Sequence, residues 1–300
     1  MDQSIQFDRS TESAAKLLIE LALAEDLRDR GDLTSQSTIP AELNASVNLV
    51  SRERGVLCGA PLIPLVFEQL ESNVRCELFV QDSSILQRGS LIATMSGPVR
   101  TLLTAERTIL NFMIHLSGVA SRTRMFAERV SGTKAVILDT RKTLPGYRLL
   151  HKYAVRCGGG VNHRMGLFDG ILIKDNHLAA RGERSVAGAV NDARMFLSST
   201  GIQLPIEIEV DTLTQLRDAL DAKPEIVLLD NMSCDEMSEA VRIRDAHSPT
   251  TRLEASGGVT LDTVRAIAET GVDRISIGGL THSAPALDLG FDWPWSSLPD

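Results

Sequence analysis

IEIEVD at residues 206–211 and IVLLDN at 226–231 are two of six short apolar runs that decide the fold of this chain, and each run ends on polar or glycine residues. The other four are AVILDTRK (135–142), GILIKDN (170–176), RLEASGG (252–258) and RISIGG (274–279). Helical patterns separate the later runs. This alternation is typical of parallel strands joined by helical crossovers, and such folds place their active sites at the carboxyl ends of the strands.

Outward from these runs, the sequence predicts an α/β protein of two domains. Six strand–helix units between residues 135 and 279 are too few for a complete barrel, which takes eight units and ~250 residues. We therefore expect residues 116–284 to form an incomplete α/β barrel of about six strands, with an open doubly wound sheet as the alternative.

The first domain is expected to be of a different kind. Residues 1–115 begin with a helical pattern at 11–27 and continue with short strands separated by glycines, which predicts an α/β sandwich with an antiparallel sheet. Residues 101–130 predict one long helix, or two helices broken near Gly118. We expect the last segment, residues 285–300, to pack on this first domain.

The composition excludes several classes of protein. The chain has 300 residues, of which 43% are hydrophobic, and a net charge of −8, which argues against disorder and against a broad basic surface for nucleic acid. No run approaches the ~20 apolar residues of a membrane helix, and the polar N-terminus does not resemble a secretory signal. The four cysteines form no C-x-x-C motif. We therefore expect a cytoplasmic protein that binds neither membranes nor nucleic acid.

Basic residues concentrate in one stretch of this acidic chain, residues 140–175. Arg141, Lys142 and Lys174 directly follow apolar strands, so they are expected above the strand ends. Three cations gathered there require an anionic ligand such as a phosphate or a carboxylate, because they would otherwise repel one another. Three further cations have helical spacing and fit a solvent-exposed helix face or a supporting position behind the site: Arg148, Lys152 and Arg156.

Glycines follow two of the strands. Ser256-Gly257-Gly258 and Gly278-Gly279 each come directly after an apolar run. Exposed backbone N–H groups at such turns make a phosphate cradle, so the pair predicts a phosphate site, with ordinary tight turns as the alternative.

Carboxylates complete the predicted site. Glu207 and Glu209 point to one face of their strand, and Asp230 ends the next strand. Such carboxylates suit sugar hydroxyls or a magnesium ion, which prefers oxygen ligands. The alternative is that they pair with Lys142 or Lys174, which we expect of Glu207 more than of Glu209 or Asp230.

These residues also resemble a known family. The motifs AERTILNFMIHLSGVAS, DTRKTLPGYRLLHKYAVRCGGGVNHR, ILIKDNH, IEIEV, LLDN, LEASGGV and ISIGGLTHS, with GDLTSQ near residue 31, are similar to those of quinolinate phosphoribosyltransferases. The resemblance covers nearly the whole chain, and it implies an N-terminal sandwich and a barrel-like domain. It further implies phosphoribosyl transfer from phosphoribosyl pyrophosphate (PRPP) to quinolinate, release of CO2 and pyrophosphate, magnesium as cofactor, and a place in NAD biosynthesis.

The resemblance also implies roles for individual residues. It assigns to the anionic substrates Arg107, Thr140, Arg141, Lys142, His163, Arg164 and Lys174. Glu209 and Asp230 would hold the ribose or the metal, and with Lys142 and Lys174 they are the candidate catalytic residues. The 5′-phosphate cradle would consist of Ser256, Gly257, Gly258, Ile277, Gly278 and Gly279. Arg107 would reach the site of a neighbouring subunit, which implies a homodimer with shared active sites, or a higher oligomer.

Three other functions fit parts of the pattern. A phosphoribosyltransferase for another acidic aromatic compound would need the same cations. A barrel aldolase would use Lys174, at the end of an apolar strand, as its Schiff-base nucleophile. A non-catalytic nucleotide sensor would bind PRPP without releasing pyrophosphate.

Overall fold

The computed structural model of this chain describes residues 5–182, 185–293 and 295. The chain divides into two units: unit 1 comprises residues 1–124, 143–159 and 279–300, and unit 2 comprises residues 125–142 and 160–278. The division differs from the expected boundaries of 1–115 and 116–284, chiefly because residues 143–159 return to unit 1. Of the expected C-terminal segment, residues 294 and 296–300 lie outside the described residues.

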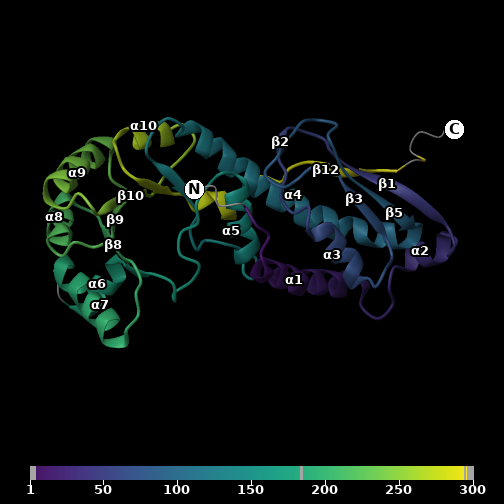
Figure 1. The fold of residues 1–300 in the computed structure, drawn as a ribbon, viewed down its shortest axis with the longest axis horizontal. Helices are drawn as coiled ribbons and strands as arrows, with labels where there is room; N and C mark the ends of the chain where they lie inside the picture. The colour runs from purple at the N-terminus through teal and green to yellow at the C-terminus, as the bar shows by residue number, and fades with distance from the viewer. Residues whose placement is uncertain (1–4, 183–184, 294, 296–300) are drawn as a thin grey trace. The chain divides into compact units, whose positions relative to one another are not determined.

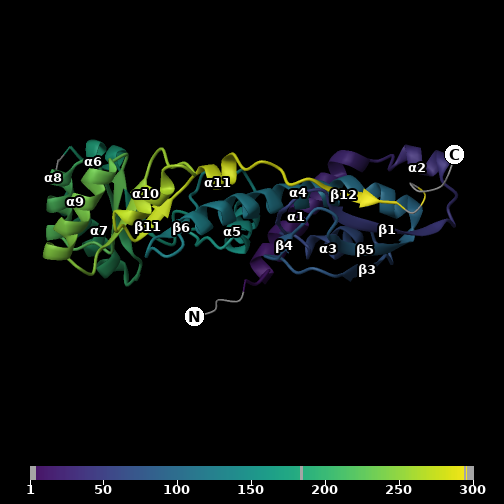
Figure 2. The same ribbon diagram turned by 90° about the horizontal axis from the view of Figure 1, so that it is seen from above.

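Unit 1 is built around an antiparallel sheet. Its strands are β1 (Asn44–Ser51), β2 (Gly55–Val56), β3 (Arg75–Leu78), β4 (Ile85–Leu86), β5 (Leu91–Pro98) and β12 (Leu289–Asp292). Its helices are α1 (Arg9–Leu27), α2 (Leu33–Thr38), α3 (Leu62–Gln69), most of α4 (Val99–Arg129), α5 (Arg148–Cys157) and α11 (Gly279–His282). The main sheet has the order β12-β1-β5-β3, and Figure 2 shows β1, β5 and β3 side by side. The C-terminal strand β12 therefore completes the N-terminal sheet.

Local sequence explains the first helix. Asp8 is its N-cap and accepts a hydrogen bond from the Thr11 N–H at 2.8 Å, so the helix begins at Arg9. Apolar residues every four positions, Ala15, Ile19 and Leu23, form one buried stripe. This stripe anchors α1, which contacts both α3 and α5.

The long helix α4 is continuous, which confirms the prediction of one long helix over the alternative of two helices broken near Gly118. A Cβ atom at Gly118 would lie 2.1 Å from the carbonyl oxygen of Pro285. The glycine therefore permits a close approach of backbone to the helix, and it does not end the helix.

Of the two positions expected for the cations of α5, solvent exposure is wrong for one residue. Lys152 is fully buried, and Arg148 and Arg156 are half-buried. The preceding residue, His151, is buried as well, and its Nε2 lies 2.7 Å from Nε2 of His115 in α4. Lys152 is buried because α5 packs inside unit 1. Helical spacing shows that residues share a face, but it does not show whether that face meets solvent or a neighbouring element.

Unit 2 is built on a parallel sheet. Its strands are β6 (Val136–Leu138), β7 (Ile171–Ile173), β8 (Ile206–Val210), β9 (Ile226–Asp230), β10 (Arg252–Ser256) and β11 (Arg274–Ser276). Its helices are α6 (Asp175–Arg181), α7 (Val186–Thr200), α8 (Leu213–Asp221), α9 (Cys234–His247) and α10 (Val264–Glu269). The strand order is β6-β11-β10-β9-β8-β7, and among the described residues β6 and β7 do not pair. The six-stranded sheet expected from the sequence is confirmed, and it does not close.

Helices cover one face of this sheet, and charged side chains occupy the other. Figure 1 shows α8, α9 and α10 along the outer side of β8, β9 and β10. Leu172 of β7 lies opposite Glu207 of β8, so Lys174, two residues later, lies beside Glu209. The pairings of β8 with β9, of β9 with β10 and of β10 with β11 continue the same face, whose further polar members are Asp230, Glu254, Ser256 and Arg274.

Candidate active site

Lys174 and Glu209 form an ion pair at the carboxyl ends of β7 and β8. Glu209 is 9% exposed and Lys174 is 44% exposed in their side chains, so the carboxylate lies below a cation that reaches the surface. The backbone N–H of Lys174 donates to Nδ1 of His177 at 2.9 Å, which fixes the start of α6. The expectation that Glu207, more than Glu209, would pair with a lysine is wrong, because the strand register brings Lys174 beside Glu209.

Asp230 lies at the end of β9, where Asn231 links it to the glycine turn after β10. The side-chain amide of Asn231 donates to Oδ2 of Asp230 at 2.7 Å, and its backbone N–H donates to the carbonyl of Ser256 at 2.9 Å. Gly257 has φ +96°, and a Cβ there would lie 2.1 Å from Oδ1 of Asn231. Only glycine fits at this position, so the expected cradle and the expected sugar-binding carboxylate form one connected structure.

The segment after β6 carries two exposed cations, Arg141 and Lys142. It begins at Asp139, which is fully buried and accepts hydrogen bonds from the backbone N–H of His163 at 2.9 Å and from the amide of Asn162 at 2.6 Å. The Thr140 hydroxyl accepts a hydrogen bond from the Lys142 N–H at 3.0 Å. The buried carboxylate thus connects the segment of Arg141 and Lys142 with that of His163.

Arg141 and Arg164 are close enough to influence each other. Burial lowers the pKa of the Arg164 guanidinium, and the positive charge of Arg141 lowers it further. Arg164 donates from Nη1 to the carbonyl of Gly170 at 3.0 Å, which holds the side chain. Two guanidinium groups held near each other are an arrangement that an anion stabilises.

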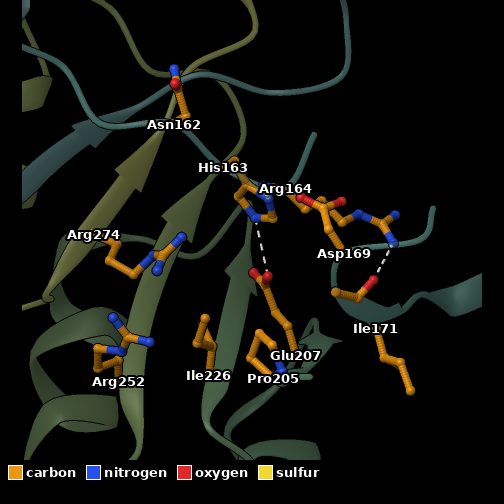
Figure 3. A pocket seen from close by; sticks show the side chains of 11 residues that line it. Asn162, His163, Arg164, Asp169, Ile171, Pro205, Glu207, Ile226, Arg252 and Arg274 are labelled. Atoms are coloured by element: carbon orange, nitrogen blue, oxygen red, sulfur yellow. Dashed lines mark hydrogen bonds and ion pairs between the residues drawn. The ribbon is translucent and has the colours of Figure 1, made fainter. Parts of the chain in front are cut away.

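A cavity of about 230 Å³ lies beside these groups (Figure 3). Its walls are formed by Asn162, His163, Arg164, Asp169, Gly170, Ile171, Pro205, Glu207, Ile226, Arg252 and Arg274. In Figure 3 the imidazole of His163 points at the carboxylate of Glu207, and Nε2 lies 3.0 Å from the Glu207 oxygen. The same Nε2 lies 3.4 Å from Glu254, which also accepts a hydrogen bond from Nε of Arg274 at 2.7 Å.

The electrostatics of these buried groups are interdependent. Burial lowers the pKa of His163, but the hydrogen bonds to Glu207 and Glu254 outweigh this effect and raise it. Burial raises the pKa of Glu207 despite its hydrogen bond with His163. Burial also opposes the charge of Glu254, but His163 and Arg274 lower its pKa overall. Glu207 and Glu254 therefore hold a proton on Nε2 of His163, and Nδ1 accepts a hydrogen bond from the Arg164 N–H.

Most of the residues expected from the sequence belong to unit 2. Unit 2 contains Thr140, Arg141, Lys142, His163, Arg164, Lys174, Glu209, Asp230, Ser256, Gly257, Gly258, Ile277 and Gly278. Arg107 and Gly279 belong to unit 1, and the substrate roles of all these residues stay predictions. The sequence reasoning missed Asp139, Glu254, Arg252 and Arg274. For Glu254 and Arg274 a signal was present, since charged residues inside short apolar runs are unusual.

Strand ends that carry cations, carboxylates and glycine turns define an enzyme that acts on phosphorylated, anionic substrates. The family model described as "Quinolinate phosphoribosyl transferase, C-terminal domain" matches residues 119–292, and the model of the N-terminal domain of the same enzyme matches residues 32–117. The chain therefore belongs to the quinolinate phosphoribosyl transferase family.

Individual relatives agree with this assignment. The carboxylating nicotinate-nucleotide pyrophosphorylase of Mycobacterium leprae is 46% identical over 281 residues, which cover 93% of this chain and 97% of the relative. A probable enzyme of the same name from Bacillus subtilis is 42% identical over 92% of each chain. The structure of the nicotinate-nucleotide pyrophosphorylase from Francisella tularensis matches with a TM-score of 0.85 and 40% identity, and the match covers 93% of this chain and 96% of that one.

Proposed function

We propose that the strand-end site transfers the phosphoribosyl group of PRPP to the ring nitrogen of quinolinate and releases pyrophosphate and CO2. The product is nicotinate mononucleotide, which serves NAD biosynthesis. The observation that carries this proposal is that cations and carboxylates both follow the carboxyl ends of one parallel sheet: Arg141 and Lys142 come after β6, Lys174 follows β7, and Glu209 and Asp230 lie at the ends of β8 and β9. Quinolinate carries two carboxylates and PRPP carries a phosphate and a pyrophosphate, so both substrates require such cations.

The first step breaks the bond between ribose C1 and the pyrophosphate oxygen. Pyrophosphate leaves with the bonding electron pair, and positive charge develops on the sugar while the lone pair of the pyridine nitrogen forms the new bond to C1. Glu209 and Asp230 supply negative charge beside the sugar, which stabilises this charge. Lys174 and Lys142 offset the charge of the anionic groups.

The second step is the loss of the 2-carboxylate as CO2. The bond between C2 and the carboxylate breaks, and its electron pair stays on C2, next to the positively charged ring nitrogen. A proton from solvent then completes C2. Because the pyridinium itself accepts the electron density, the chain needs no organic cofactor for this step.

Magnesium is the cofactor that we propose, and the residues fit it. Glu209 uses one carboxylate oxygen for Lys174, and Asp230 uses one for Asn231, so each has a second oxygen at the strand ends. Carboxylate oxygens are the ligands that magnesium prefers. When bound, the ion would offset the negative charge of PRPP.

Incubation of the purified protein with quinolinate, PRPP and magnesium tests the proposal. We expect stoichiometric CO2 and nicotinate mononucleotide, measured by trapped label and by chromatography with mass spectrometry, and loss of both products in EDTA. Replacing quinolinate by other acidic aromatics tests the related transferases, and borohydride trapping of Lys174 with a carbonyl substrate tests the aldolase. PRPP binding without pyrophosphate release would instead indicate a sensor.

We also propose a homodimer with shared active sites, in the cytoplasm. The support is Arg107, whose side chain is 71% exposed on α4 and whose nearest acidic partner, Glu106, is 3.9 Å away. Mixing inactive Arg107→Ala with inactive Lys174→Ala should restore about a quarter of the activity, since half of the dimers are hybrids with one intact site. Hybrids verified by mass spectrometry without restored activity would place Arg107 in its own subunit's site. Sedimentation would distinguish a dimer from a higher oligomer.

No described helix is long and apolar enough to cross a membrane.

A further inference from the structure

Two buried glutamates in unit 2, Glu207 and Glu254, have no role in the proposed chemistry. They lie on the same face of the sheet, in β8 and β10, and they are 4% and 0% exposed. We infer that they are positioning residues: they clamp the imidazole of His163 and thereby fix the backbone of Arg164 at the anion-binding part of the site. The inference rests on the proposed function, because the anion at Arg164 is taken to be quinolinate.

A continuous chain of contacts connects the glutamates with Arg164. Nε2 of His163 lies 3.0 Å from Glu207 and 3.4 Å from Glu254. Nδ1 of the same ring accepts a hydrogen bond from the backbone N–H of Arg164 at 2.7 Å. Both nitrogens of His163 are therefore engaged within the protein, so its contribution to substrate binding passes through its neighbour.

The strands hold the glutamate end of this series of contacts. Arg274 of β11 donates from Nε to Glu254 at 2.7 Å, so Glu254 has a second cation besides His163. Glu207 has only His163 as an ion-pair partner among the described residues, and its other oxygen, Oε1, is buried without a hydrogen-bond partner there. Two carboxylates thus share one imidazole, and removal of Glu207 leaves the ring to Glu254 alone.

Arg164 needs such an anchor. Arg141 is close enough to lower the pKa of Arg164, so the two guanidinium groups repel each other when no anion is bound. The side chain of Arg164 is held by the Gly170 carbonyl, and its backbone N–H is held by His163. The ring of His163 can hold that N–H only while Glu207 and Glu254 keep it in place.

Two variants of Glu207 and one control test this inference. Glu207→Ala removes the acceptor of the His163 Nε2–H, whereas Glu207→Gln keeps an acceptor oxygen of the same reach. Asp273→Asn is the matched control, because Asp273 accepts hydrogen bonds from Arg244 at 2.7 Å and from the Leu253 N–H at 2.8 Å in the same unit. In the hydrogen bonds and ion pairs of the described residues, neither Asp273 nor its donors Arg244 and Leu253 contact His163 or Arg164.

We expect Glu207→Ala to raise KM for quinolinate at least tenfold, with kcat and KM for PRPP changed less than twofold. Glu207→Gln should raise KM for quinolinate much less than Glu207→Ala does. Asp273→Asn should lower the urea midpoint and leave both KM values unchanged. Amide hydrogen exchange, which needs no substrate, should be faster at Arg164 in Glu207→Ala and unchanged there in Asp273→Asn.

Several results would overturn the inference. An unchanged quinolinate KM or unchanged exchange at Arg164 in Glu207→Ala would remove the positioning role, and an equal rise of both KM values would indicate a general structural defect. The ligand atoms of His163, Glu207 and Glu254 lie within 4.8 Å of one another, so a divalent metal that purifies with the protein and is lost in Glu207→Ala would replace the inference by a metal site. Wild-type protein inactive on quinolinate would refute the proposed function, and the exchange measurement would still decide the positioning role.

Discussion

Substituting Gly257 by alanine should damage the site more than the same change at Gly258. Both glycines have positive φ, +96° and +59°, so alanine costs about 1–2 kcal/mol of backbone strain at either position. At Gly258 a Cβ meets nothing within 4 Å, but at Gly257 it would lie 2.1 Å from Oδ1 of Asn231. Asn231 must then move, and its hydrogen bonds to Asp230 and Ser256 each contribute about 1 kcal/mol. We therefore expect about 3–4 kcal/mol of destabilisation for Gly257→Ala.

Urea unfolding of both variants and of the wild type measures this difference. Steady-state kinetics should show a higher KM for PRPP and a lower kcat in Gly257→Ala, because Asp230 loses the amide that orients it. Gly258→Ala is the control for the strain alone. Equal unfolding free energies of the two variants, with unchanged kinetics in Gly257→Ala, would refute the connection between the glycine turn and Asp230.

Three further changes have defined outcomes. Arg141→Ala should weaken quinolinate binding by about 2–5 kcal/mol while the fold is kept, and wild-type affinity by calorimetry would contradict its assignment. Asp230→Asn should lower kcat more than it weakens PRPP binding, whereas weaker binding with unchanged kcat would indicate mere anchoring. Burial, together with the charge of His115, lowers the pKa of His151 to about 4. Between pH 6.5 and 4, His151 is therefore protonated in the unfolded state and neutral in the folded state. The free energy of unfolding should be fully retained above pH 6.5 and about 2 kcal/mol lower at pH 5. In urea titrations at several pH values, His151→Phe should show a smaller decline. The same decline at low pH in this variant would exclude His151 as its cause.

The sheet of unit 2 was predictable because each strand is a short apolar run with a polar end. Arg141, Lys174 and Asp230 were recognised in this way, since a residue directly after a parallel strand lies at the functional edge. The glycines at 257 and 258 were recognised for the same reason. The sequence immediately around each strand was sufficient to predict where these residues lie.

Other features depend on which segments become neighbours, and the sequence does not show this. Lys152 is buried because α5 packs inside unit 1, although its spacing with Arg148 fits an exposed face. Glu254 is held by His163, which comes from a loop some 90 residues earlier, and by Arg274 of the next strand. The choice between Glu207 and Glu209 for Lys174 likewise required the register of β7 with β8.

That register has a consequence for how the chain folds. A slip of β8 by one residue would turn Glu207 and Glu209 toward the helices and bring Ile206 and Ile208 onto the charged face. Each carboxylate would then be buried without its cation, a state that costs several kcal/mol per charge. The polar face therefore disfavours misaligned strand pairing while the sheet folds, before any substrate is bound. The carboxylates that hold His163 and Lys174 in the finished protein thus also favour the correct alignment of its strands.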